Sequence, residues 1–403
     1  MKPSKAALIG VSDQGLSSAF NLLATVLVAR VASDREFGAF GVLMTAYLLT
    51  ITVGKGVTGG AVAINLARHN EADFRVGASR ALGASFAFGL MVSACCLIAA
   101  AATSSTLRTM LVIGALTFPA LTLQDTCRQL CYARGRPALA ALSSLTWGAC
   151  QVTLFGLLSL SAIVSPVWFA TAWAVSSLGG IAIPIWRLSP SRRDFSARAW
   201  FKDHGSIVRN MTFDYLLIAM TVSGAPLIIG LIAGLESVGS LRGAITLFGP
   251  LTMINHGLYM AMLPLASRRW ADGDRAFHHP LRNAGAVLAV SCAVWGLILN
   301  RLPDSIGREI LGDTWPQTQR LLIVAGVWIG LGYAAEPAIA ALRIVGRSGL
   351  VARFRIVLAP ASIIGAAFGA GLAGVHGAVA CLALATAVTA LTFWSAFIRE
   401  RRP

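Results

Sequence analysis

Residues 137–186 read PALAALSSLTWGACQVTLFGLLSLSAIVSPVWFATAWAVSSLGGIAIPIW and contain no Asp, Glu, Lys or Arg. The stretch is more than twice as long as the roughly 20 apolar residues that an α-helix needs to cross a hydrocarbon core. Residues 356–398 form a second stretch of the same kind. Because unpaired backbone groups are too costly in lipid, each stretch predicts two membrane-spanning helices joined by a short turn.

The composition of the whole 403-residue chain agrees with this interpretation. Hydrophobic residues make up 56% and charged residues 12%, and the mean hydropathy is +0.72, whereas soluble domains carry about 25% charged residues. The formal net charge of +16 is typical of nucleic-acid-binding proteins, but here the basic residues lie in short segments between apolar stretches, on alternate sides of the membrane. We therefore predict an all-α, polytopic membrane protein without a nucleic-acid partner.

The hydropathy pattern predicts about twelve transmembrane helices, and the basic residues of every second connecting segment place both termini in the cytoplasm. The expected helices lie near residues 9–31, 37–66, 81–103, 107–132, 137–160, 166–187, 207–234, 238–266, 283–301, 319–342, 350–372 and 375–398.

An internal repeat relates the two halves of the chain. A shift of 201 residues aligns the first two helices with the seventh and eighth, and a shift of 211 residues aligns the fourth helix with the tenth. The matched positions are Asp13 and Asp214, Gly38 and Gly239, Asp125 and Glu336, and Arg136 and Arg347. Two copies of six helices with the same orientation predict a parallel repeat, in which the substrate path of a transporter lies between the halves.

The domain organisation expected from this repeat has three parts. They are an N-terminal six-helix lobe at 1–188, a cytoplasmic linker at 189–206 and a C-terminal six-helix lobe at 207–403. The linker reads SPSRRDFSARAWFKDHGS, and its mixture of basic and aromatic residues favours a segment that lies in the membrane interface. A plain solvated linker is the alternative.

Six ionisable residues fall inside the predicted helices, where they are expected to face an aqueous cavity or a charged partner. They are Asp13, Lys55, Asp125, Arg128, Asp214 and Glu336. On the predicted topology all six lie in the cytoplasmic half of the membrane. We interpret the four acids as a gate that pairs with Lys55 and Arg128 when closed, and the two cations as substrate-binding residues once the gate opens.

Simpler interpretations exist for most of these residues. Asp125 and Arg128 are three residues apart and could pair along their own helix. Asp13 and Asp214 lie near predicted helix starts, where an acid complements the helix dipole. Lys55 has a glycine on each side and no nearby acid in the sequence, which favours a position facing a cavity.

The seven cysteines all lie within or at the ends of apolar stretches. Cys127 and Cys131 are one helical turn apart, but no histidine or third cysteine accompanies them. This spacing is typical of packed small hydrophobic side chains. We predict no metal site and no cofactor.

Several short motifs together resemble the bacterial polysaccharide flippases of the multidrug/oligosaccharidyl-lipid/polysaccharide exporter superfamily. The motifs are DQGLSS at 13–18, VARV at 28–31, DREFG at 34–38, VGSLRGA at 238–244, LFGP at 247–250 and LGDTW at 311–315. At 403 residues the chain is short for that family, and it lacks the two additional helices of the lipid II flippase branch.

The resemblance implies a fold and a cargo. It implies a V-shaped pair of six-helix bundles that give alternating access to a central cationic cavity in the bacterial cytoplasmic membrane. It implies that an isoprenoid-diphosphate-linked glycan moves from the inner to the outer leaflet without chemical change, so the protein is not an enzyme. Its partners would then be the lipid-linked oligosaccharide, membrane lipids and polysaccharide-assembly proteins.

Two other functions remain open at this stage. A diphosphate needs basic partners, which Lys55 and Arg128 can supply, whereas a cation-coupled multidrug antiporter of the same fold favours an acidic, aromatic-lined cavity. A membrane glycosyltransferase is the third candidate, because Asp34 and Glu36 form an acidic pair in the first outer loop. The short outer loops argue against this enzyme.

Overall fold

The computed structural model describes residues 3–64, 66, 70–103, 105–161 and 163–400, and every regular element in these residues is helical. The chain divides into two compact units. Unit 1 comprises Met1–Ala32 and Ala39–Ala219, and unit 2 comprises Ser33–Gly38 and Met220–Pro403.

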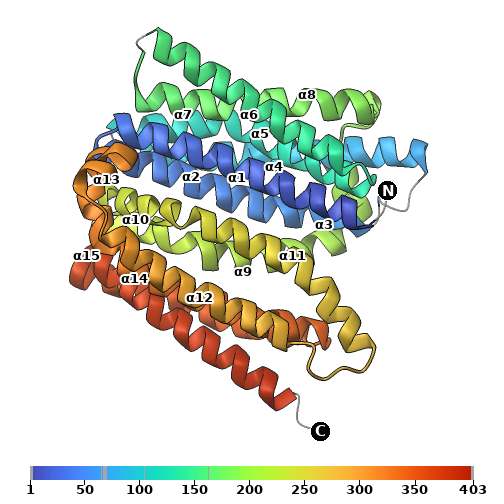
Figure 1. Ribbon diagram of the computed structural model, residues 1–403. Helices are drawn as coiled ribbons and strands as arrows, with labels where there is room; N and C mark the ends of the chain where they lie inside the picture. The colour runs from blue at the N-terminus through green and yellow to red at the C-terminus, as the bar shows by residue number, and fades with distance from the viewer. Residues whose placement is uncertain (1–2, 65, 67–69, 104, 162, 401–403) are drawn as a thin grey trace. The chain divides into compact units, whose positions relative to one another are not determined.

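Unit 1 is built from antiparallel helices that pack along their lengths (Figure 1), with α4 against α5, α6 against α1 and α8, and α5 against α8. Its elements are α1 (Pro3–Val31), α2 (Asp34–Gly54), the π-helical turn η1 (Lys55–Gly59), α3 (Gly60–Ile64), α4 (Glu71–Ala101), α5 (Ser105–Ala133), α6 (Pro137–Leu160), α7 (Pro166–Val175), α8 (Ser177–Leu188), the 3-10 turn η3 (Arg192–Asp194) and the first part of α9 (Ala197–Ala233).

Unit 2 is organised around α14, which packs against α10, α12 and α15. Its elements are the end of α9, α10 (Leu235–Leu247), α11 (Gly249–Ala271), α12 (His279–Asn300), α13 (Asp304–Leu311), the 3-10 turn η4 (Gly312–Thr314), α14 (Trp315–Ile344) and α15 (Ser348–Glu400).

The long α15 contains two helices. Ala373 and Gly374 have non-helical backbone angles, and Gly374 has a φ of +57°, which favours glycine. Gly369 and Gly377 then face each other closely, so the chain reverses between them. With α15 counted as two rods and the broken pairs α2–α3, α7–α8, α10–α11 and α13–α14 as one rod each, the described residues form the twelve helical rods that the sequence predicts.

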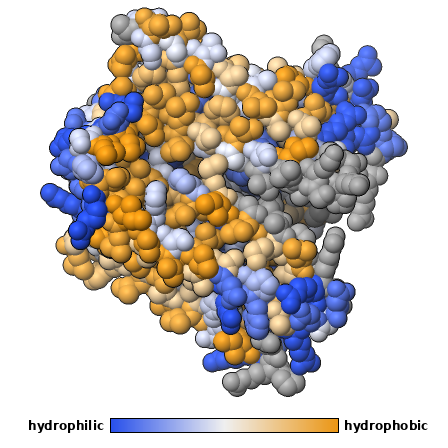
Figure 2. Space-filling model, viewed as in Figure 1, coloured by the Kyte–Doolittle hydropathy of each residue, from blue (hydrophilic) through white to orange (hydrophobic). Residues whose placement is uncertain are grey.

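The outer faces of these helices are apolar. Nine helices in the described part of the chain are long and apolar enough to span a membrane, or ten if the bent α9 is included. Large aliphatic side chains lie at the surface, among them Leu116 and Leu231, which are 76% and 81% exposed. Figure 2 shows hydrophobic residues along the flanks of the helices and hydrophilic residues gathered at helix ends. This arrangement fits a multi-pass membrane protein.

The segment 189–206 is joined to unit 1, and its place in the membrane interface stays a prediction. Helix α9 already begins at Ala197, and Trp200 is fully buried in the core of unit 1, where its indole N–H donates to the Val57 carbonyl at 3.0 Å. Arg80 of α4 holds the segment through an ion pair with Asp203 at 2.7 Å. The segment therefore belongs to unit 1, and the chain passes from unit 1 to unit 2 between Ala219 and Met220, inside α9.

Candidate functional site

The π-helical turn η1, at Lys55–Gly59, joins α2 to α3. The sequence VGKGVTGG around it is rich in glycine, which weakens a regular helix. Glycine is also needed for packing, because a Cβ built on Gly56 would lie 2.5 Å from the Thr212 Cα of α9. A Cβ built on Gly59 would overlap the Gln129 side chain of α5. Turns of this kind are frequent at functional sites.

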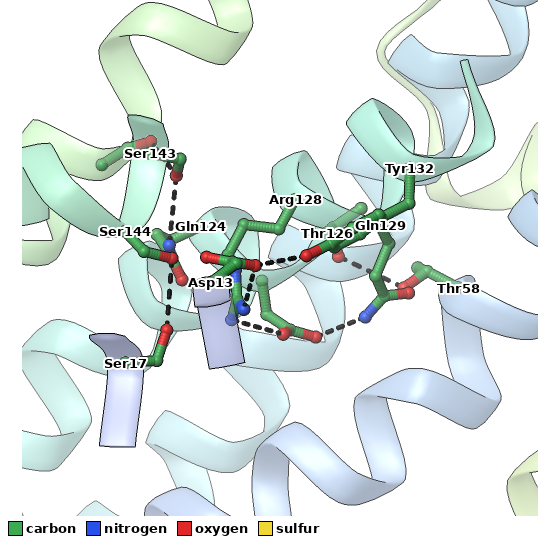
Figure 3. Close-up of polar contacts among 12 residues, drawn as sticks. Asp13, Ser17, Thr58, Gln124, Thr126, Arg128, Gln129, Tyr132, Ser143 and Ser144 are labelled. Carbon is green, nitrogen blue, oxygen red and sulfur yellow. Dashed lines mark hydrogen bonds and ion pairs between the residues drawn. The ribbon is translucent and has the colours of Figure 1, made fainter. Parts of the chain in front are cut away.

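A buried ion cluster lies on α5 beside this turn (Figure 3). Asp13 of α1 is fully buried and accepts hydrogen bonds from Arg128 Nη2 at 2.7 Å and from the Tyr132 hydroxyl at 2.5 Å. Arg128 also lies 3.8 Å from an Asp125 carboxylate oxygen, and Gln129 donates to the other oxygen of Asp125. We call these residues the Asp13–Arg128 cluster.

The Asp13–Arg128 cluster carries two carboxylates and one guanidinium group, so its formal charge is negative. Buried charges are tolerated only when they are paired and hydrogen-bonded. Asp13 Oδ1 is buried and has no hydrogen-bond partner among the described residues. The cluster can therefore take up one further cationic or hydrogen-bonding group.

Hydroxyl groups connect the π-helical turn to the cluster. The Thr58 and Thr126 hydroxyls lie 3.2 Å apart, and Thr126 donates to the Ser85 hydroxyl of α4 at 2.9 Å. These residues and Asp125 line a cavity of about 10 Å³, which is close to the space that one water molecule needs. A movement of the turn would thus disturb the hydroxyls beside Asp125.

Lys55 is exposed and makes no ion pair within the described residues. Of the two cations expected in the gate, Arg128 pairs with acids and Lys55 has no such pair among the described residues, and the gate stays a prediction. The helix-local pair of Asp125 and Arg128 also exists, but the shorter contact of Arg128 is with Asp13 on another helix.

The other two predicted gate residues are not members of the Asp13–Arg128 cluster. Asp214 of α9 is half-buried and has no ion pair in the part of the chain that the structure describes. Glu336 of α14 belongs to unit 2 and accepts a hydrogen bond from Asn255 Nδ2 at 2.9 Å. Sequence reasoning missed Tyr132, although its position one turn after Arg128 places it on the same face of α5.

A second polar layer fixes α1 in unit 1. Ser17 donates to Ser144 of α6 at 3.2 Å, and the Trp173 indole donates to Asn21 Oδ1 at 3.0 Å. Gln151 donates to the Phe20 carbonyl at 2.9 Å. These interhelical bonds hold the helix that supplies Asp13, and polar side chains commonly serve this purpose between membrane helices.

No family model and no curated protein sequence matches the chain. Solved structures match over nearly its full length. A MATE-family multidrug resistance transporter of the MOP superfamily, in an inward-facing conformation, matches with a TM-score of 0.75 and 12% identity over 98% of each chain. The lipid II flippase MurJ, in an inward closed conformation, matches with a TM-score of 0.72 and 11% identity over 96% of this chain and 87% of that chain.

A MATE structure in the straight conformation matches with a TM-score of 0.67 and 14% identity over 99% of this chain and 95% of that chain. The protein therefore has the MOP fold, with twelve transmembrane helices in two six-helix bundles. The predicted fold class is confirmed, whereas membership of the superfamily and of its polysaccharide flippases stays a prediction.

Proposed function

We propose that the protein is an alternating-access flippase that moves an isoprenoid-diphosphate-linked glycan across the bacterial cytoplasmic membrane, unchanged, with both termini in the cytoplasm. One observation carries the proposal. Lys55 is an exposed cation on an irregular turn, and this turn packs on the helix that holds Arg128, Asp125 and the contact with Asp13. The shared fold with a lipid II flippase supports a cargo of this type.

The cluster suggests how binding of the cargo and movement of the helices are coupled. A diphosphate forms strong charge-assisted hydrogen bonds with lysine and arginine. When it binds Lys55 and approaches Arg128, it competes with Asp13 and Asp125 for the guanidinium group. Loss of the bond between Arg128 and Asp13 weakens the connection of α1 to α5, which then rests on the hydrogen bond from Tyr132 to Asp13.

Asp214 and Glu336 have a subordinate role in this proposal. They are gate carboxylates on α9 and α14 that become available to the cations of the site as the cargo enters. The partners of the flippase are the lipid-linked oligosaccharide, membrane lipids and the proteins that assemble the polysaccharide.

The proposal is tested by reconstitution. Purified protein in proteoliposomes receives a fluorescent isoprenoid-diphosphate-linked oligosaccharide in the outer leaflet, and a membrane-impermeant quencher reports the fraction that has moved. Protein-dependent movement that is lost on Lys55→Ala substitution supports the proposal. Movement at the rate of empty liposomes contradicts it.

A cation-coupled multidrug antiporter is the second candidate, because two buried carboxylates share one guanidinium group and one carboxylate oxygen of Asp13 is left unpaired. Such a group can bind a proton or a metal cation during exchange. Accumulation of a fluorescent cationic drug in the same proteoliposomes, driven by an imposed ion gradient, distinguishes this function from glycolipid movement.

A further inference from the structure

Unit 2 contains a cavity of about 640 Å³ that is lined only by residues of that unit. One face of α11 provides Asn255, Tyr259 and Ser267, at intervals that are multiples of four residues. One face of α14 provides Glu336 and Arg343. Positions with this spacing share a helix face, and Asn255 and Ser267 are about 18 Å apart along the axis at a rise of about 1.5 Å per residue.

The polar groups of this cavity are incompletely paired. Asn255 uses its Nδ2 to donate to Glu336, which leaves its Oδ1 as an acceptor. This oxygen and the Tyr259 hydroxyl are both buried without a hydrogen-bond partner among the described residues. Buried polar atoms destabilise a structure unless a partner is supplied. A ligand that carries hydroxyl groups supplies both a donor for Asn255 and a partner for Tyr259.

The charged groups of the cavity have a net positive charge. Arg343 of α14 and Arg355 of α15 line the cavity with Glu336 as the one carboxylate, and the charge of Arg355 acts on Glu336. The planar guanidinium group matches phosphate oxygens in geometry and is less strongly hydrated than an ammonium group. Leu263 and Ile339 add an apolar wall that can cover carbon atoms.

We propose that this cavity binds a phosphate ester of a polyhydroxy compound. Arg343 and Arg355 hold the phosphate, while Asn255, Tyr259 and Glu336 bind the hydroxyl groups. The volume lies within the range of about 300–1,000 Å³ that small-molecule sites occupy. The ester is either the head group of a membrane lipid or a soluble phosphate. The proposal does not depend on the flippase function, because the cavity lies within unit 2 and shares only Glu336 with the proposed gate.

Binding is measured by isothermal titration of the full-length protein in nanodiscs of zwitterionic lipid. The probes are dioctanoyl forms of phosphatidylglycerol, phosphatidic acid and phosphatidylcholine, together with soluble glycerol 3-phosphate. We expect phosphatidylglycerol to bind at least about tenfold more tightly than phosphatidylcholine, which corresponds to about 1.4 kcal/mol. Saturable binding of glycerol 3-phosphate identifies a soluble ester as the source, and binding of the diacyl form alone identifies a lipid.

Variants separate the two roles within the site. The double variant Arg343→Gln, Arg355→Gln should lose about tenfold or more in affinity for phosphatidylglycerol. Arg355→Lys should lose less affinity, because the positive charge remains and only the planar guanidinium group is removed. Arg353→Gln is the matched control, since Arg353 is exposed on the same helix and does not line the cavity. Tyr259→Phe should weaken the binding of phosphatidylglycerol several-fold, by roughly the value of one hydrogen bond. The affinity for phosphatidic acid should not change.

Three results would overturn the proposal. The first is equal affinity for phosphatidylglycerol and phosphatidylcholine. The second is an equal loss of affinity in Arg353→Gln and in the double variant Arg343→Gln, Arg355→Gln, which would indicate surface charge alone. The third is an equal effect of Tyr259→Phe on phosphatidic acid and phosphatidylglycerol. A thermal unfolding midpoint close to that of the parent protein shows for each variant that a loss of binding is local.

Discussion

Gly38 at the start of α2 and Gly239 at the start of α10 pack against each other within unit 2. A Cβ built on Gly239 would lie 3.1 Å from the Gly38 nitrogen and 3.1 Å from the Asp34 carbonyl oxygen, and one built on Gly38 would overlap the Leu235 carbonyl. The 201-residue repeat maps Gly38 onto Gly239 and Asp34 onto Leu235. The contact is therefore reciprocal, as it is between surfaces related by a two-fold axis.

This contact predicts that Gly38→Ala is destabilising. The new methyl group meets a backbone carbonyl, which cannot move aside cheaply, and overpacking of this kind costs about 1–3 kcal/mol. Gly205→Ala in α9 is the control, because nothing lies within 4 Å of a Cβ at that position, and alanine is favoured over glycine in a helix by roughly 0.5–1 kcal/mol. Thermal unfolding in detergent should show a lower midpoint for Gly38→Ala and an unchanged or higher one for Gly205→Ala. A midpoint that rises in both variants would contradict the close packing.

The Asp13–Arg128 pair makes a second prediction about stability. Removal of one partner from a buried ion pair leaves an uncompensated charge and typically costs about 3–5 kcal/mol. Arg128→Gln should therefore lower the unfolding midpoint strongly, since it leaves Asp13 and Asp125 without their shared cation. The double variant Asp13→Asn, Arg128→Gln should recover part of the loss, because only one carboxylate then remains.

The control for this pair is Arg269→Gln. Arg269 forms an ion pair with Asp274 at 2.6 Å, but its side chain is 45% exposed, and exposed pairs contribute only about 0–1 kcal/mol. Additive effects of Asp13→Asn and Arg128→Gln would show that the two residues are not coupled in the folded protein.

Substitution of Lys55 should affect transport and leave the stability of the protein unchanged. Its side chain is exposed and makes no ion pair in the described residues, so Lys55→Ala should leave the unfolding midpoint within the small range expected of surface substitutions. Glycolipid movement should fall by at least about tenfold if one charge-assisted contact to the diphosphate is lost. Lys55→Arg should retain part of the activity, since the charge stays and its geometry changes. Lys202→Ala, an exposed lysine on α9, should transport normally.

The sequence predicts the helices of this fold well, because the penalty for exposing backbone groups to lipid leaves few alternatives. It predicts the environment of single side chains less well. The mixture of arginine and aromatic residues in 189–206 suits a membrane interface, yet Trp200 is buried in unit 1 and bonded to Val57. A tryptophan has an apolar body and a single N–H donor, so both environments satisfy it.

In the candidate site, too, the sequence identifies residues better than it predicts their partners. Its ionisable residues could be found from their rarity in apolar stretches, but the pairing of Arg128 with Asp13 depends on how α1 lies against α5. The local spacing of Asp125 and Arg128 offered a partner that was nearer in the chain. The π-helical turn at Lys55 could not be predicted either, since glycines permit several backbone geometries and the packing of Gly56 on Thr212 selects one.

The last prediction separates Asp13 from Asp214, the two acids that the repeat makes equivalent. Asp13 is fully buried and paired with Arg128, whereas Asp214 is half-buried and unpaired within the described residues. Asp13→Asn should lower the unfolding midpoint, because a buried guanidinium group loses its closest anion. Asp214→Asn should leave that midpoint unchanged.

Transport shows whether Asp214 acts in the gate despite this difference. If it becomes a partner for the cations of the site during the cycle, Asp214→Asn should slow glycolipid movement and change its pH dependence while stability is preserved. Asp272→Asn provides a control, since Asp272 is an exposed acid between α11 and α12. Normal movement and an unchanged pH profile in Asp214→Asn, together with slow movement in Asp13→Asn, would confine the gate to the Asp13–Arg128 cluster. Of the two acids that the repeat relates, only Asp13 would then act with a cationic partner, Arg128.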